Sequence, residues 1–264
     1  MNETASVKIH PTAIVSPKAE LGNDVEVGPF CTIGPNVKIG NGTKLISHVV
    51  VDGQTTIGSF NQFFPFSVIG GVPQDLKYNG ELTELLIGDH NTIRESVTLN
   101  LGTVQGGGKT VLGNNNLLMA YTHLGHDALV GDHCVLANSV AIAGHVILDD
   151  HAIIGGLTGV TQFVHVGAHV YVGAGAMVDK DAPPFSVLVG ARPCEIKGAN
   201  LVGLRRKSFK NDAILAINES LKLWKQSELQ KEECLQKIES EFGAFEEVKF
   251  LIDFIRKSKN GCLR

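Results

Sequence analysis

The sequence predicts a mainly β solenoid of six-residue repeats, followed by a C-terminal α-helical domain. An apolar residue recurs at every sixth position, with few breaks, from Ile9 to Val178, and helical periodicity replaces this repeat near the C-terminus. Neither the 3.6-residue period of a helix nor the two-residue period of a strand produces a six-residue repeat, whereas a solenoid of short parallel strands does. The period also predicts which residues stack on one another.

Two long runs of repeats support this fold. The apolar positions of the first run are Ile9, Val15, Leu21, Val27, Ile33, Ile39, Leu45, Val51, Ile57, Phe63 and Ile69, and those of the second run extend from Leu112 to Val178. The residue after each of them is often glycine, which suits a corner that needs a positive φ or no Cβ in the way. Three such sides close a triangular coil of eighteen residues, and parallel ladders join successive coils.

The repeat is interrupted twice. Residues about 72–86 are polar and turn-rich, yet Ile87 follows Ile69 by eighteen residues, so we expect this segment to bulge out while the spacing of one coil is kept. Residues about 104–110 contain a glycine run and shift the phase. Excursions from a regular scaffold often carry binding groups. The glycine run lacks the Gly-Lys-Ser/Thr sequence of a phosphate-binding loop, so a flexible loop is favoured.

A different domain is predicted after the repeats, with boundaries of 1–190 for the solenoid and 191–264 for the helical domain. Apolar residues at helical spacing mark one helix around Ile214–Trp224 and another around Val248–Ile255. The segment from about 229 to 241, rich in Glu, Lys and Leu, predicts a third helix. Such a bundle is expected to cover the open end of the solenoid, whose exposed strand edges otherwise invite aggregation.

Composition excludes several classes of protein. The net charge of −4 gives no sign of nucleic-acid binding. No signal segment and no stretch long enough to span a bilayer is seen. The five cysteines are odd in number, far apart and without a Cys-x-x-Cys pair, which indicates a reducing compartment. We therefore expect a cytoplasmic protein with no integral membrane segment.

Histidines are the most informative polar residues, and seven of the ten lie between residues 123 and 169. Counting by eighteens places Gly144 and Gln162 in one column with His126, and His145 directly next to Asp127. An imidazole can act as a general base toward a hydroxyl, an aspartate can orient it, and a glycine N–H can stabilise an oxyanion. His123, close by, is a candidate for substrate binding. These parts indicate acyl transfer rather than a set of merely solvated corners.

A second histidine column contains His133, His151 and His169, again eighteen residues apart. Neutral imidazoles are common metal ligands. No cysteine or clear carboxylate cluster accompanies them, so a solvated histidine stack is the favoured interpretation and no metal site is predicted.

Nearly the whole chain resembles the bacterial UDP-N-acetylglucosamine acyltransferases that begin lipid A (lipopolysaccharide) biosynthesis. The resemblance rests on strings such as Gln-Asp-Leu-Lys-Tyr (74–78), Gly-Thr-Val-Gln-Gly-Gly-Gly (102–108), His-x-x-His-Asp (123–127) and Ala-Gly-His-Val (143–146). Many acyltransferases share the hexapeptide repeat, but the strings at 74–78 and 102–108 are far narrower.

The resemblance implies a left-handed parallel β-helix assembled as a homotrimer with active sites between subunits. It also implies transfer of a 3-hydroxyacyl group from acyl carrier protein to the 3-position of the UDP-sugar, with the carrier thioester as donor and no other cofactor. The implied catalytic residues are His126, Asp127 and Gly144. The implied substrate-binding residues are Asp75, Lys77, His123, His145, Gln162, Asn200 and Arg206.

Three positions depart from the family pattern. Thr161 stands where the family often has His, and Val202 stands where some members have Glu, which weakens inferences about uridine contacts. Ala174 replaces a Gly at the position that gauges acyl length in some members. Because packed apolar sites respond to single carbons, this methyl group is expected to shorten the preferred chain.

Other functions keep the same fold. One is an acyltransferase acting on the 3-amino UDP-sugar analogue or at the later N-acyl transfer step, and another is a coenzyme A-dependent acetyltransferase. Metal analysis of the purified protein would reveal a metal-dependent hydratase. Replacement of His126 by Ala should abolish acyl transfer in an acyltransferase but would have no activity to remove from a non-catalytic solenoid. The sequence does not distinguish a hydroxyl from an amine acceptor.

Overall fold

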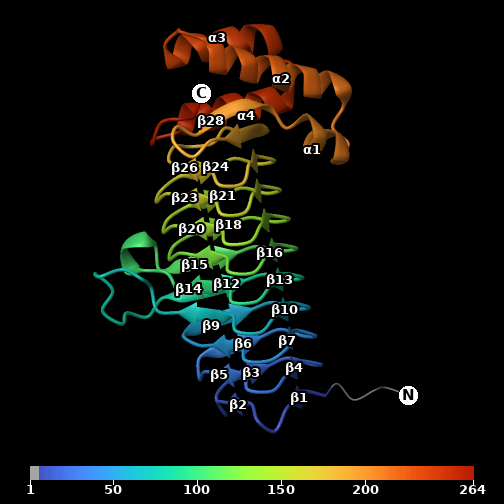
Figure 1. Ribbon diagram of the computed structural model, residues 1–264, viewed down its shortest axis with the longest axis vertical. Coiled ribbons are helices and arrows are strands. Elements are labelled where there is room, and N and C mark those ends of the chain that lie inside the picture. The colour runs from blue at the N-terminus through green and yellow to red at the C-terminus, as the bar shows by residue number, and fades with distance from the viewer. Residues whose placement is uncertain (1–5) are drawn as a thin grey trace.

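The computed structural model describes residues 6–264. The first five residues lie outside the described residues. They are the start of the predicted solenoid domain and of the N-terminal segment that is expected to carry no signal. The chain winds into a left-handed parallel β-helix with helices stacked on its C-terminal end (Figure 1). The predicted fold class is therefore confirmed.

Three parallel sheets form the sides of the prism, and each coil contributes one short strand to each sheet. Sheet A contains β1 (Lys8–Ile9), β4 (Glu26–Val27), β7 (Lys44–Leu45), β10 (Gln62–Phe63), β13 (Thr92–Ile93), β16 (Leu117–Leu118), β19 (Val135–Leu136), β22 (Ile153–Ile154), β25 (Tyr171–Val172), β27 (Ser186–Val189) and, antiparallel to β27, β28 (Glu195–Ala199). Sheet B contains β2 (Ile14–Val15), β5 (Thr32–Ile33), β8 (Val50–Val51), β11 (Val68–Gly71), β14 (Thr98–Asn100), β17 (His123–Leu124), β20 (Ala141–Ile142), β23 (Gly159–Val160) and β26 (Met177–Val178). Sheet C contains β3 (Glu20–Leu21), β6 (Val37–Ile39), β9 (Gln54–Ile57), β12 (Glu84–Ile87), β15 (Lys109–Leu112), β18 (Leu129–Val130), β21 (Ile147–Leu148) and β24 (His165–Val166).

The six-residue apolar positions form the core. Phe63, Ile93 and Leu118 stack along the inside of sheet A with no exposed surface, and their counterparts in the other sheets are also buried. The first coil differs, because no residue within 6–264 lies below it: Ile9 points inward yet is 47% exposed, whereas Val27, one coil above, is 2% exposed. The core therefore depends on stacking between coils.

The segment at about 72–86 bulges out as expected, but the expectation that it keeps the spacing of one coil is wrong. Ile87 lies in sheet C and pairs with Ile57, whereas Ile69 lies in sheet B and pairs with Leu99. The polar segment is thus an insertion within one side of the prism, and its length imitates the spacing of a full coil. Both insertions, between β11 and β12 and between β14 and β15, leave the same B–C corner in successive coils (Figure 1).

Of the two reasons expected for the corner glycines, the structure confirms the second at Gly28, where a Cβ would be in the way. At Gly28 a Cβ would lie 1.8 Å from the carbonyl oxygen of Ile46, so close approach of the next coil excludes a side chain there. The positive φ falls two residues later, on non-glycine residues such as Phe30, Asp127 and His145. In this left-handed conformation, uncommon for residues with a Cβ, the corner carries many of the aromatic and polar side chains of the surface.

Four helices follow the prism and cover its C-terminal end (Figure 1). They are α1 (Leu201–Arg206), α2 (Asn211–Gln226), α3 (Lys231–Phe242) and α4 (Glu246–Lys257). The predicted apolar faces of α2 and α4 are buried, and α3 matches the third predicted helix; the short α1 was not predicted. The predicted boundary at 190/191 falls in the connection between β27 and β28 and stays a prediction. Among the described residues, no helix has the length and apolar character needed to cross a bilayer.

The second histidine column is a stack of imidazole rings on the C–A corner. The ring centroids of His133 and His151 lie 4.9 Å apart, those of His151 and His169 lie 4.7 Å apart, and Phe185 continues the stack above His169. Burial lowers the pKa of His169 to about 4, and His151 and Lys207 act in the same direction. Burial also lowers the pKa of His151. The neutral forms of the His151 and His169 rings are therefore favoured.

This stack predicts a loss of stability in mild acid. Between about pH 6.5 and 4 the unfolded chain takes up a proton at residue 169 that the native protein does not, so the free energy of unfolding should fall as the pH is lowered through this window, by roughly 2 kcal/mol. A His169→Phe variant should lose this part of the pH dependence, and Phe occupies the equivalent positive-φ position at residue 185. Urea unfolding at pH 7 and pH 4.5 measures the difference, and equal pH dependence in both proteins would contradict the assignment.

Candidate active site

The candidate site lies on the B–C corner, in the coil directly after the two insertions. β17 ends at Leu124 and β18 begins at Leu129, and the turn between them carries His126 and Asp127. The positive φ of Asp127, 60°, turns its carboxylate back toward the preceding coil. Both side chains are buried, with exposed fractions of 6% and 4%.

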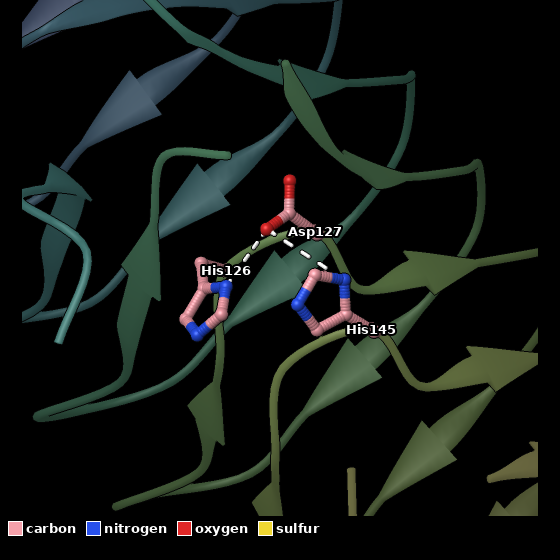
Figure 2. Close-up of side chains that lie close together, drawn as sticks. All are labelled: His126, Asp127 and His145. Carbon is pink, nitrogen blue, oxygen red and sulfur yellow. Dashed lines mark hydrogen bonds and ion pairs between the residues drawn. The ribbon is translucent and has the colours of Figure 1, made fainter. Parts of the chain in front are cut away.

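His126 and Asp127 form a hydrogen-bonded pair (Figure 2). Nδ1 of His126 lies 2.7 Å from Oδ2 of Asp127. Because an ionised carboxylate only accepts hydrogen bonds, this contact places the imidazole proton on Nδ1 and leaves Nε2 as a base. The geometry is that of a general base held by an orienting acid.

His145, one coil above Asp127 as counted, completes the cluster. Its Nδ1 lies 3.8 Å from Oδ2 of Asp127, and its ring meets that of His126 edge-on with centroids 5.0 Å apart. Its other face stacks on Phe163 at 4.5 Å. Burial lowers the pKa of His145, against the opposing influence of Asp127 and Asp75, so a neutral ring is favoured.

Within residues 6–264, one group of three His, Cys, Asp or Glu side chains has its potential metal-ligand atoms all within 4.8 Å of one another. This group is His126, Asp127 and His145. The carboxylate oxygens of Asp127 are already engaged, because they accept hydrogen bonds from Thr103 and from His126. The arrangement is therefore that of a hydrogen-bonded pair, and the expected absence of a metal stays a prediction.

Gly144 packs directly against the His126 ring. A Cβ at this position would lie 2.6 Å from Cε1 and 2.7 Å from Nε2 of His126. Its N–H donates no hydrogen bond to the described part of the chain. The predicted column is thus confirmed in space, and it leaves an unobstructed N–H beside the imidazole.

A cavity of about 400 Å³ opens beside these residues and extends up the outer face of sheet B. Its lining combines the predicted His123, Gly144 and Gln162 with small and apolar residues of successive strands. The lining residues are Gln74, Asn100, His123, Gly125, His126, Ala141, Ile142, Ala143, Gly144, Gly159, Val160, Thr161, Gln162 and Met177. Burial lowers the pKa of His123, and its Nδ1 lies 2.8 Å from Oγ1 of Thr98.

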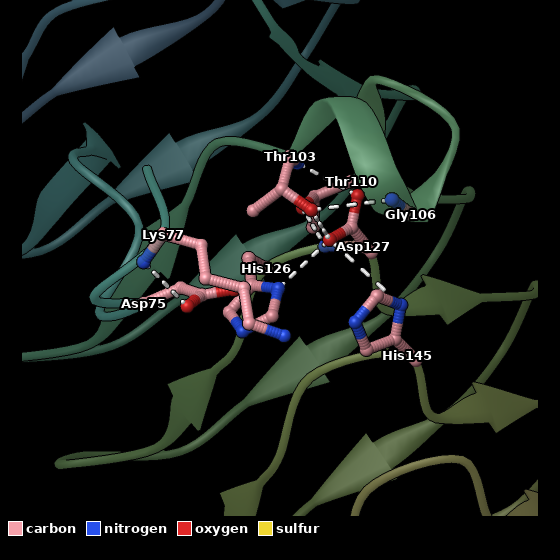
Figure 3. Close-up of polar contacts among 8 residues, drawn as sticks. All are labelled: Asp75, Lys77, Thr103, Gly106, Thr110, His126, Asp127 and His145. Carbon is pink, nitrogen blue, oxygen red and sulfur yellow. Dashed lines mark hydrogen bonds and ion pairs between the residues drawn. The ribbon is translucent and has the colours of Figure 1, made fainter. Parts of the chain in front are cut away.

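The first insertion brings two predicted substrate-binding residues to this corner (Figure 3). Asp75 and Lys77 lie on the loop beside His126, and the Lys77 N–H donates a 2.9 Å hydrogen bond to Oδ1 of Asp75. Gln74, on the same loop, lines the cavity. A carboxylate and an ammonium group thus lie beside His126.

Comparison with known proteins decides the family. A family model described as "Udp N-acetylglucosamine O-acyltransferase; Domain 2" matches residues 181–263, and one for the bacterial transferase hexapeptide matches residues 109–144. LpxA from Acinetobacter baumannii is 44% identical, with a TM-score of 0.94, over 97% of this chain and 99% of that one. The chain belongs to the UDP-N-acetylglucosamine O-acyltransferase family.

Two further members of this acyltransferase family give the same result. LpxA from Bacteroides fragilis is 42% identical, with a TM-score of 0.94 and coverage of 97% of this chain and 100% of that chain. LpxA from Moraxella catarrhalis is 41% identical, with a TM-score of 0.93 and coverage of 97% and 99%. The protein is therefore an acyltransferase enzyme, as predicted.

Not every predicted residue of the acyltransferase site meets the others within one chain. Asn200 begins α1, where its side chain accepts from the N–H of Gly203 and donates to the carbonyl of His169 at 3.0 Å. Arg206 lies exposed in the last turn of that helix. Both sit above the C–A corner, away from the B–C corner that holds His126 (Figure 1).

The predicted length gauge is also displaced from the cavity lining. Ala174 is exposed at the A–B corner, whereas Met177 of β26 lines the cavity. A Cβ on Gly159 would lie 2.9 Å from the Met177 sulfur, so this side chain lies over Gly159 at the far end of the lining. Sequence reasoning missed Met177, although its position three coils above His123 was a usable signal.

Close packing at Gly144 predicts that Gly144→Ala disables the enzyme without unfolding it. The added methyl group would displace the buried imidazole and crowd the free N–H, so kcat should fall at least about a hundredfold. Gly156→Ala is a matched control, because Gly156 occupies the same repeat position and its Cβ would meet no atom closer than 3.2 Å. Steady-state kinetics with thermal melting tests this; a Gly144→Ala protein as active as the control would contradict it.

Proposed function

We propose that this acyltransferase moves a 3-hydroxyacyl group from the thioester of acyl carrier protein to the 3-hydroxyl of UDP-N-acetylglucosamine, the first step of lipid A biosynthesis. The observation that carries the proposal is the His126–Asp127 pair, buried at the mouth of a partly apolar cavity and packed against Gly144. The family and the solved relatives support the acceptor, because one of them is named as a UDP-N-acetylglucosamine acyltransferase.

The geometry supports a simple sequence of bond changes. Nε2 of His126 removes the proton of the sugar hydroxyl as its oxygen attacks the thioester carbonyl, and the N–H of Gly144 stabilises the oxyanion. The C–S bond then breaks as the ester C–O bond is completed. The imidazolium returns its proton to the carrier thiolate, so His126 ends as it began. The thioester is the acyl donor, and no other cofactor is required.

Substrate-binding groups around the pair suit the proposed acceptor. Asp75 and Lys77 face the site from the first insertion, and His123, His145 and Gln162 border the imidazole and the cavity. Neutral imidazoles at residues 123 and 145 can donate and accept hydrogen bonds with sugar hydroxyl groups.

A homotrimer with sites between subunits accounts for the residues that one chain keeps apart. Asn200 and Arg206 lie at a different corner from His126, so a neighbouring copy would have to supply them to the same substrate. Arg206 next to Lys207 suits a nucleotide diphosphate or an acidic carrier protein. We assign the reaction to the cytoplasm, which agrees with five free cysteines, four of them buried.

Loss of the proposed base gives the first test. His126→Ala should lower kcat by about 10²–10⁴-fold, because the attacking hydroxyl keeps its proton, while the melting temperature changes little. Product analysis with UDP-N-acetylglucosamine and its 3-amino analogue also identifies the acceptor. Undiminished turnover in the variant would remove His126 from the mechanism, and preference for the amine would replace the proposed acceptor.

We expect the side chain of Met177 to limit the length of the acyl chain that the cavity accepts. Shortening it in Met177→Ala should open the groove above Gly159 and raise kcat/KM for longer donors about tenfold relative to the preferred one. Ala174→Gly tests the position suggested by the family pattern. A series of acyl carrier protein donors measures both variants, and an unchanged length profile in both would show that neither residue limits the chain.

A further inference from the structure

The buried carboxylate of Asp127 has a partner that neither the repeat nor the family strings assigned a role. This partner is Thr103, which lies near the start of the second insertion and is 1% exposed. Its backbone N–H donates to Oδ1 of Asp127 at 2.7 Å, and its hydroxyl lies 2.6 Å from Oδ2 (Figure 3). One threonine therefore contacts both carboxylate oxygens.

The direction of the hydroxyl hydrogen bond follows from its other contact. The N–H of Gly106 donates to Oγ1 of Thr103 at 3.2 Å, where Thr103 caps the 3₁₀ turn η1 (Val104–Gly106). With Oγ1 accepting from this N–H, its single proton is available for Asp127. The carboxylate of Asp127 therefore accepts from both the backbone N–H and the hydroxyl of Thr103.

Gly106 belongs to the same arrangement around the Asp127 carboxylate. A Cβ at this residue would lie 2.0 Å from the carboxylate carbon of Asp127, so the turn can close on the carboxylate only with glycine there. The hydroxyl of Thr110, in β15 just after the insertion, accepts a 2.7 Å hydrogen bond from the backbone N–H of Asp127. The insertion and the strand that follows it thus hold both the carboxylate and the backbone of Asp127.

We propose that Thr103 is a positioning residue for catalysis: through the chain Gly106 N–H, Thr103 Oγ1–H and Asp127 Oδ2, it keeps the carboxylate an oriented acceptor for Nδ1–H of His126. This inference rests on the proposed role of His126. It explains why a glycine-rich insertion stands next to the site without forming a phosphate-binding loop. The insertion acts on His126 through Asp127, so the insertion need not contact the substrate.

The decisive variants are Thr103→Val and Thr103→Ser, with Thr158→Val as control. Valine keeps the shape and suits the extended backbone of residue 103 (φ −121°, ψ 155°), but it removes the hydroxyl. Serine retains it. Thr158 is equally buried and donates one hydrogen bond to the Gly173 carbonyl, with no contact to the pair.

Thr103→Val should lower kcat about tenfold to a hundredfold with little change in KM, and the acidic limb of the pH–rate profile should move to higher pH. Thr103→Ser should stay within about threefold of the parent enzyme, and Thr158→Val should leave kcat and the profile unchanged. A Thr103→Val enzyme with the parent kcat and pH profile would overturn the proposal, as would a serine variant as impaired as the valine variant.

A measurement without turnover separates this inference from the proposed function. The ¹⁵N resonances of the His126 ring, assigned with a His126→Gln protein, should report the Nδ1–H form in the parent and in Thr103→Ser, and a mixture of tautomers in Thr103→Val. Inactivity of the parent toward the acyl carrier donor would refute the proposed function alone. Identical ring resonances in the parent and the valine variant would refute the positioning role alone.

Discussion

Backbone hydrogen bonds between successive coils govern the whole molecule, because they decide which side chains share a column. Each coil is tied to the next by contacts such as His145 N–H to the His126 carbonyl at 3.0 Å. At roughly 4.8 Å per coil, a ring that bends over the next coil leaves no room for a side chain on the residue that it covers. His126 can fill this space only because Gly144 leaves it empty.

The same constraint explains why the polar cluster is built from one corner. A buried carboxylate is costly unless its oxygens accept hydrogen bonds. The turn of Asp127 cannot supply enough donors by itself, and the preceding coil contributes them only because the insertion brings Thr103 back over the corner. The loop and the His126–Asp127 pair are therefore interdependent parts of one structure, while the scaffold below them continues unchanged.

Much of this could be predicted from the sequence. The six-residue period predicted the fold, and counting by eighteens correctly placed His126 below Gly144, His145 beside Asp127, and the three stacked imidazoles. Counting failed between Ile69 and Ile87, because an insertion can imitate a coil. Thr103 was missed for a related reason: residues of an insertion belong to no column, so only folded coordinates show what they touch. Asn200 and Arg206 stay separate from His126 because no period within one chain relates them.

The two ends of the β-helix differ in how much free energy local unfolding of the terminal coil requires. Since every coil rests mainly on its neighbours, opening costs least where a coil has one neighbour and no cover. That is the end holding Ile9, which is 47% exposed, whereas α2 and α4 bury their apolar faces at the opposite end. We therefore expect thermal unfolding to begin at the first described coil, and several coils separate that coil from Asp127. The lowest turns can then open and re-form while the corner that holds His126 and Asp127 stays assembled.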